Sequence, residues 1–177
     1  MKIYFAGPDV LRKYDQGWFD FIASICENYN VEPILPIDNG YQGEKVVKHE
    51  EIYEINLAKI NMADCIVANL QPFRGPSADP GVCVEVGYAR ALNKKVYGHY
   101  NGYLPGEYID RVNEYLQKVY HDRPEWLRSE LYPKIEDFNI MDNLMIINSC
   151  TEILPDILGA ISRASGWADK TERDKLL

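Results

Sequence analysis

The sequence predicts a single α/β domain in which strands and helices alternate along the chain. Two observations predict this fold class. Short apolar segments that end in glycine, proline or other turn residues are typical of strands, and they occupy residues 2–7, 31–37, 65–70 and 95–100. Apolar residues at helical spacing predict helices over residues 16–29, 49–62, 82–92 and 107–119. We expect one domain over residues 1–177, in which the charged segment 167–177 forms a frayed tail.

The first strand, Lys2–Gly7, is stopped by Gly7-Pro8. A first strand that ends in glycine indicates a ligand site at the carboxyl edge of a Rossmann-like sheet. The dinucleotide fingerprint G-x-G-x-x-G and the Walker loop are both absent. The helix that follows directs one side toward the core, with Trp18, Phe19, Phe21, Ile22, Ile25 and Cys26.

The second strand is interrupted by Pro33 and Pro36, which confines it to an edge of the sheet or makes these residues its ends. A turn over residues 38–41 follows at its carboxyl end. The helix over 49–62 has Ile52, Ile55 and Ile60 among its apolar positions. It also carries Asn56, a weak helix former that faces either a site or solvent.

Residues 64–92 organise the chain as strand, long loop and helix. Cys65–Leu70 is mostly apolar and is predicted to be a strand buried on both faces. Residues 71–81 contain two glycines and three prolines, so they form a loop. Val82–Leu92 predicts a helix, with lysines just beyond its end. Ligands of open α/β sheets lie at such loops.

Two carboxylates lie in this loop–helix corner. Asp79 is in the loop, and Glu85 is placed in the first helical turn, where the helix dipole favours its ionised form. One carboxylate is then a candidate nucleophile and the other a candidate proton donor or acceptor. The alternative is that Asp79 only caps the helix and Glu85 only occupies its first turn.

The last third of the chain alternates less regularly. The helix over 107–119 is expected to direct Tyr108, Val112, Tyr115 and Leu116 inward. Residues 121–141 are polar and aromatic, with a short helix predicted near 124–131 because proline suits a first helical position. Asp142 is a candidate N-cap, and residues 153–164 predict the last helix.

Composition excludes several classes of function. A net charge of −8 argues against unspecific binding to nucleic acid. The chain lacks the roughly 20-residue apolar run of a membrane span and lacks a signal peptide, so we expect a soluble cytoplasmic protein. Four cysteines without a C-x-x-C pair and three scattered histidines argue against zinc. The cysteines are expected to be reduced, and a thiol nucleophile at Cys83 is a minor alternative.

Four segments together resemble nucleoside 2-deoxyribosyltransferases. They are Ile3–Pro8, Ala63–Gly75, Asp79–Ala89, and Glu136–Phe138 with Asp142–Ile146. The segments occur in the family's order over residues 3–146, and the central one is the most specific. The resemblance implies a flavodoxin-like, three-layer fold with a mostly parallel sheet of roughly five strands. It also implies transfer of 2-deoxyribose between a 2′-deoxynucleoside and a free purine or pyrimidine base, without a metal or organic cofactor.

The resemblance implies a role for each matching residue. Glu85 matches the nucleophile that forms a covalent glycosyl-enzyme intermediate, Asp79 the acid/base residue, and Tyr4 the residue that orients the glutamate. Asn143 and Met145 match residues that family members lend to a neighbouring subunit, which implies a homo-oligomer: a dimer, tetramer or hexamer. The other expected substrate-binding residues are Gly7, Asp38, Asn56, Phe73, Arg74 and Gly81.

Two alternative functions use the same pocket. One is an N-glycosidase that hydrolyses nucleosides or their 5′-monophosphates, for which Arg74, Ser77 and the Gly75 backbone are candidate phosphate donors. The other is a nucleotide-binding module without catalysis. Asn56 and Gly40 stand where family members often carry an aspartate and a glutamine near the base. These two departures leave the base preference open.

Overall fold

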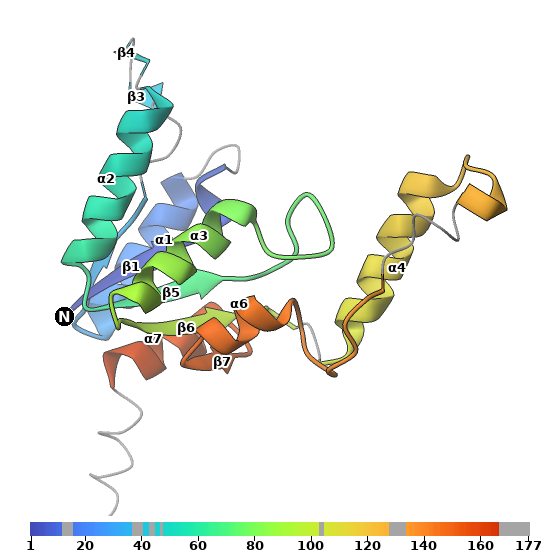
Figure 1. Ribbon diagram of the computed structural model, residues 1–177. Coiled ribbons are helices and arrows are strands. Elements are labelled where there is room, and N and C mark those ends of the chain that lie inside the picture. Colours follow the sequence, from blue (N-terminus) through green and yellow to red (C-terminus); the bar gives the residue numbers. More distant parts are fainter. Residues whose placement is uncertain are drawn as a thin grey trace, which may run out of the picture.

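The computed structural model describes residues 1–11, 16–36, 41–42, 45–46, 48–102, 105–127 and 134–166. Its centre is a sheet of five parallel strands in the order β2-β1-β5-β6-β7 (Figure 1). The strands are β1 (Lys2–Ala6), β2 (Glu32–Ile34), β5 (Cys65–Asn69), β6 (Lys95–His99) and β7 (Glu152–Leu154). In chain order this is 2-1-3-4-5, the flavodoxin-like order. The predicted fold class is therefore confirmed.

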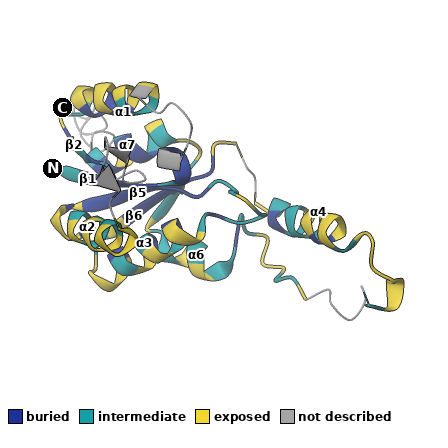
Figure 2. Ribbon diagram, turned by 90° about the horizontal axis from the view of Figure 1, so that it is seen from above, coloured by how far each residue is buried: buried dark blue, intermediate teal, exposed yellow. Residues whose placement is uncertain are grey.

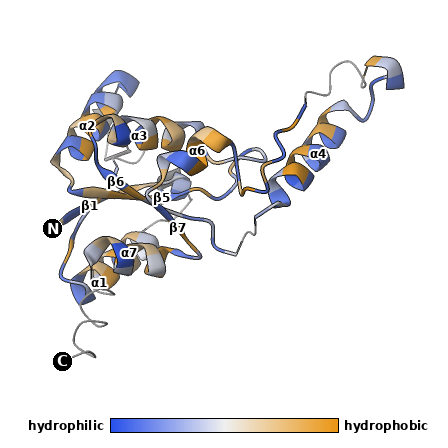
Figure 3. Ribbon diagram, turned by 60° about the horizontal axis from the view of Figure 1, so that its bottom comes forward, coloured by the Kyte–Doolittle hydropathy of each residue, from blue (hydrophilic) through white to orange (hydrophobic). Residues whose placement is uncertain are grey.

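Helices cover both faces of the sheet, which gives three layers (Figure 3). One face is covered by α2 (His49–Met62), α3 (Pro80–Ala91) and α6 (Leu144–Ser149). The other face is covered by α1 (Gln16–Asn28) and α7 (Ile157–Ser165). The short 3-10 helix η1 (Pro8–Leu11) follows β1, and the two-residue strands β3 (Tyr41–Gln42) and β4 (Lys45–Val46) form a separate antiparallel pair.

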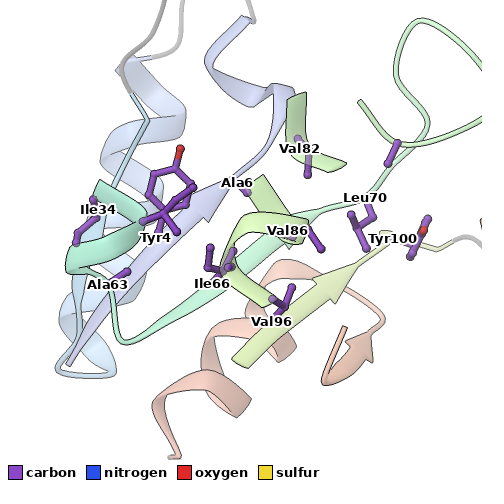
Figure 4. Close-up of a cluster of buried hydrophobic side chains, with 14 residues drawn as sticks. Tyr4, Ala6, Ile34, Ala63, Ile66, Leu70, Val82, Val86, Val96 and Tyr100 are labelled. Carbon is purple, nitrogen blue, oxygen red and sulfur yellow. The ribbon is translucent and has the colours of Figure 1, made fainter. Parts of the chain in front are cut away.

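The pleat of each strand separates two cores. Tyr4 and Ile66 face the α2/α3 layer, whereas Ile3 and Val67 face the α1/α7 layer. Every residue of β5 is buried, as its apolar sequence predicts, because the strand lies in the middle of the sheet (Figure 2). Figure 4 shows the α2/α3 core, in which Tyr4 packs among aliphatic side chains.

The helix α4 (Glu107–Tyr120) projects away from the three layers (Figure 1). Its first residues are held by the segment 140–141, since the Gly106 N–H donates to the carbonyl of Ile140. Tyr108 and Leu116 are buried as expected, but Tyr115 is 43% exposed because so little of the body lies beside the helix. Within the described residues, the helices are too short or too polar to span a bilayer.

Several predicted elements differ from the structure. The last predicted helix, 153–164, is strand β7 followed by α7, because three residues complete the edge of the sheet beside β6. α3 begins at Pro80, two residues earlier than predicted. Phe21 of α1 is 48% exposed and Ile55 of α2 is 37% exposed, so neither points into the core.

Other predictions hold or lie outside the described part of the chain. β2 is an edge strand, as its prolines predict. Residues 125–127 are helical, which agrees with the start of the short helix predicted near 124–131. The end of that helix, most of the turn at 38–41 and the tail 167–177 lie outside the described residues.

Candidate functional site

A hydrogen bond between β1 and α3 forms the centre of the site. Tyr4 is fully buried, and its hydroxyl donates to Oε1 of Glu85 over 2.6 Å. The pleat of β1 directs Tyr4 toward the helix layer, and α3 packs on β1, so the two side chains meet across 81 residues of sequence. The bond fixes one carboxylate oxygen of Glu85 and leaves Oε2 for another contact.

Burial controls the charge of Glu85. Desolvation raises the pKa of this carboxyl from 4.5 to about 7, the hydrogen bond from Tyr4 lowers it, and the charge of Asp79 raises it. The prediction that the helix start favours the ionised form is therefore wrong. Since α3 begins at Pro80, Glu85 lies in its second turn, beyond the first turn where the helix dipole acts.

Asp79 is the N-cap of α3. Its Oδ1 accepts hydrogen bonds from the N–H groups of Gly81 at 2.9 Å and Val82 at 3.3 Å, and Pro80 occupies the first helical position. A Cβ on Gly81 would lie 2.9 Å from this oxygen, so a larger residue there would displace the capping carboxylate. Both bonds end on Oδ1. Within the described residues Oδ2 has no hydrogen-bond partner, so the cap and a second role are compatible.

A second set of polar groups lies at the carboxyl ends of β1 and β5. Asn69 Nδ2 donates to Asp9 Oδ2 over 2.8 Å, and Asn69 Oδ1 accepts from the N–H of Gln71 at 3.1 Å. A Cβ on Gly7 would lie 2.8 Å from Asp9 Oδ2 and 3.0 Å from Asn69 Cβ. Gly7 thus lets η1 approach the end of β5, where the sequence places a ligand site.

The loop between β5 and α3 extends toward α4 (Figure 1). The Arg74 guanidinium lies 4.7 Å from the centre of the Phe73 ring, and the Phe73 N–H donates to the Ser77 carbonyl at 3.0 Å. Arg74 also lines a cleft of about 280 Å³ with residues of α4 such as Arg111 and Lys118. The structure thus groups Phe73 and Arg74 with α4.

Asn143 caps α6, where the prediction placed Asp142. Its Oδ1 accepts from the Met145 N–H at 2.9 Å, and its Nδ2 donates to Glu136 Oε1 at 3.1 Å. Met145 is 69% exposed. Asp142 instead accepts the Ala78 N–H over 2.9 Å, so the start of α6 lies beside the residue that precedes Asp79.

Three further predicted residues are Asn56, Asp38 and the alternative nucleophile Cys83. Asn56 is half-buried in the middle of α2, the helix that packs on α3. Asp38 lies outside the described residues. Burial raises the pKa of the Cys83 thiol above its usual range, so it is protonated at neutral pH and is a poor nucleophile.

The sequence reasoning singled out none of three buried polar residues. Asn69 and His99 are the last residues of β5 and β6, and Asp9 lies in η1. Burial lowers the pKa of His99 to about 4, so its ring is neutral at pH 7. Because polar side chains are mostly exposed in proteins, their residue types give no sign of this burial.

The comparisons with known proteins identify the family of this chain. The family model described as nucleoside 2-deoxyribosyltransferase matches residues 3–145, which is most of the chain. The chain belongs to the nucleoside 2-deoxyribosyltransferase family. This family transfers glycosyl groups and acts on nucleosides and bases.

Solved structures resemble this family member over most of their length. A 2-deoxyribosyltransferase from Leishmania mexicana is 25% identical, with a TM-score of 0.68, and the match covers 93% of this chain and 96% of the other. A 2-deoxyribosyltransferase from Bacillus psychrosaccharolyticus shares the fold at 17% identity, with a TM-score of 0.53 and coverage of 88% and 87%.

A relative by sequence is longer than this chain. An uncharacterized protein of Schizosaccharomyces pombe is 29% identical over 126 residues, which cover 68% of this chain. The match spans 58% of the length of that relative.

Proposed function

We propose that the protein is a nucleoside 2-deoxyribosyltransferase that transfers the 2-deoxyribosyl group of a 2′-deoxynucleoside to a free purine or pyrimidine base. The observation that carries this proposal is the 2.6 Å hydrogen bond from Tyr4 to Glu85, in the second turn of a helix capped by Asp79. A buried tyrosine that holds one oxygen of a carboxylate suits a nucleophile that must attack in a single direction.

The first displacement breaks the bond from C1′ to the base nitrogen. Oε2 of ionised Glu85 attacks C1′, while Tyr4 keeps Oε1 in place. The electron pair of the broken bond passes to the base, and a proton from Asp79 neutralises it. The product is a glycosyl ester on Glu85. Because the transition state resembles an oxocarbenium ion, a carboxylate close to C1′ stabilises it.

The second displacement reverses these steps with a new base. A nitrogen of the incoming base attacks C1′, Asp79 accepts its proton, and the Glu85 carboxylate leaves. Two inversions give net retention at C1′ and ping-pong kinetics. Every proton and electron pair is supplied by the two carboxylates and the bases, so the proposal includes no metal or organic cofactor.

Other residues are assigned to substrate binding in this proposal. Gly7 follows β1, and we propose that its neighbours limit the space near the sugar. Gly81 exposes backbone at the start of α3. The further proposed contacts to base or sugar are Asp38, Asn56, Phe73, Arg74, Asn143 and Met145.

We also propose a homo-oligomer in which Asn143 and Met145 complete the site of a neighbouring subunit. Exposed apolar side chains on the helix layer of α2, α3 and α6 support this, because a partner subunit packed there would remove them from water. They include Tyr53 and Met62 of α2, Val84 of α3 and Met145 of α6. Mixing inactive Glu85→Ala subunits with inactive Asn143→Ala subunits should restore part of the activity. No restoration after proven subunit exchange would count against the shared site.

The proposed reaction belongs to the salvage of deoxynucleosides in the cytoplasm. Cys26, Cys65, Cys83 and Cys150 are all free thiols, which fits a reducing compartment.

The Glu85 intermediate holds deoxyribose until a base or water arrives. The balance between transfer and hydrolysis therefore depends on how well the site excludes water.

The test is a product assay with purified protein, deoxyinosine and free adenine, resolved by chromatography. Deoxyadenosine formed in step with released hypoxanthine would support transfer, and Glu85→Ala should abolish it. Free base without a new nucleoside would replace the proposal with a hydrolase, to be tested next on 5′-monophosphates. Binding of nucleoside without turnover would replace it with a binding module.

A further inference from the structure

Asp142 is a fully buried carboxylate outside the proposed chemistry. Its Oδ2 accepts the Ala78 N–H at 2.9 Å, and its Oδ1 accepts the Asn143 N–H at 2.7 Å. Ala78 immediately precedes Asp79, and Asn143 is the cap of α6. One side chain thus joins two segments that each carry a residue of the proposed site.

Arg111 of α4 joins the same two segments from outside. Its Nε donates to the Pro76 carbonyl at 3.1 Å, and its Nη2 donates to the Met141 carbonyl. The positive charge of Arg111 and a hydrogen bond from the Ser77 side chain also lower the pKa of Asp142. Residues 76–78 and 141–143 are therefore held together by the hydrogen bonds of two side chains, Asp142 and Arg111.

Burying a carboxyl in this way contributes little to the stability of a fold. Desolvation is the largest influence on Asp142 and raises its pKa, against the hydrogen bonds that favour its charged form. A buried carboxyl is tolerated only when hydrogen bonds compensate for its lost hydration, as the Ala78 and Asn143 amides do here. The buried carboxyl at this corner is therefore better explained by a requirement for one defined loop position.

We propose that Asp142 is a positioning residue that holds Asp79 where it can protonate the leaving base. The inference rests on the proposed function. The path is short: the carboxylate fixes the Ala78 amide, and the next residue is Asp79, which caps α3. Asp142 touches no reacting atom. Its loss should therefore slow a reaction in proportion to how much that reaction needs the proton from Asp79.

The experiment compares two donors that differ in this need. The base of deoxyinosine leaves well only when protonated, whereas a purine deoxynucleoside methylated at N7 releases its base as a neutral molecule. Asp142→Asn keeps the shape of the side chain but offers one acceptor oxygen in place of two. Asp156→Asn is the matched control, because Asp156 also accepts a backbone N–H, from Gly159 at 2.8 Å, but it caps α7 on the other face of the sheet.

We expect Asp142→Asn to lower kcat for deoxyinosine by about tenfold or more, and to lower kcat for the methylated donor at least about fivefold less. Asp79→Asn should show the same dependence on the donor, and Asp156→Asn should leave both rates unchanged. Equal losses for both donors, or no loss, would overturn the proposal. If Asp142→Asn does not fold, Arg111→Lys is measured in the same way, since it keeps the charge and loses the fork that spans the two carbonyls.

Hydrogen exchange separates this inference from the proposed function. Peptides covering residues 71–79 should exchange faster in Asp142→Asn than in the wild type, and Asp156→Asn should not change them. Unchanged exchange would overturn the proposal that Asp142 holds the loop before Asp79 in place, even in an active enzyme. If the wild type turns over neither donor, yet Asp142→Asn shows the expected faster exchange, the proposed function is rejected. The catalytic role of Asp142 is then rejected with it, and its structural role in the loop remains.

Discussion

Replacing Glu85 with glutamine should stabilise the protein, and more so at high pH. Burial raises the pKa of Glu85 from 4.5 to about 7 in the folded state. Glutamine keeps an oxygen that can accept the Tyr4 hydroxyl bond, but it carries no charge. The substitution therefore removes the free-energy cost of burying a charge and leaves the packing nearly unchanged.

The sign and size follow from linkage. Between about pH 4.5 and pH 7 the unfolded chain releases the Glu85 proton while the folded protein keeps it, so rising pH destabilises the wild type. Above about pH 7 both states are ionised and the effect levels off. At about 1.4 kcal/mol for each pKa unit, the ionised carboxylate costs the folded state about 3 kcal/mol. This cost is absent in Glu85→Gln at every pH.

The assay is urea unfolding of both proteins at about pH 4.5 and pH 8, at one protein concentration. The stability gained by the variant should grow by about 3 kcal/mol between the two conditions, which corresponds to about 1.5 M urea at an m-value of about 2 kcal/mol/M. Glu114→Gln is the control, because Glu114 is an exposed glutamate of α4. A gain that is the same at both pH values would refute a raised pKa at Glu85.

Three further changes test the rest of the site. The kcat/KM should rise with pH through about 7 as Glu85 ionises. Tyr4→Phe removes a hydrogen bond that lowers the pKa of Glu85, so it should move the midpoint of this rise to higher pH. A midpoint that stays fixed in Tyr4→Phe would contradict this. Asp79→Asn should keep the helix cap and the melting temperature yet lower kcat for deoxyinosine by about 10²–10⁴-fold, whereas Asp79→Ala should also lose about 1 kcal/mol of stability in urea unfolding. Equal stability of the two variants would argue against the cap. Gly7→Ala should destabilise by about 1–3 kcal/mol, since its Cβ would lie 2.8 Å from Asp9 Oδ2, and a variant as stable as the wild type would show that η1 can move aside.

Local pattern was sufficient for most of the elements. The apolar run at 65–70 predicts a strand buried on both faces, and β5 lies in the middle of the sheet. The helix predicted over 49–62 has the bounds of α2. By contrast, β7 has only three residues and overlaps the start of the helix predicted over 153–164. Its pairing with β6 comes from a distant segment, so no local period marks it.

The site shows the same division. The sequence placed Asp79 and Glu85 in one loop–helix corner, and its two interpretations of Asp79, as cap and as acid, prove compatible because the cap uses one oxygen. The charge of Glu85 was predicted wrongly, since its burial depends on packing of α3 over the sheet. Asp142 was predicted to cap a helix, but its carboxylate accepts a hydrogen bond from the N–H of Ala78, 64 residues away in sequence.

The sequence alone thus determined most of the elements, the chemistry available at residues 79–85 and the family resemblance, because these depend on side-chain type and short-range spacing. Only the tertiary structure decided that Tyr4 meets Glu85, that the Glu85 carboxyl is desolvated and that Asp142 ties Ala78 to Asn143. Each of these depends on groups brought together from distant parts of the chain. Distances and dielectric environment of that kind exist only after the layers have packed.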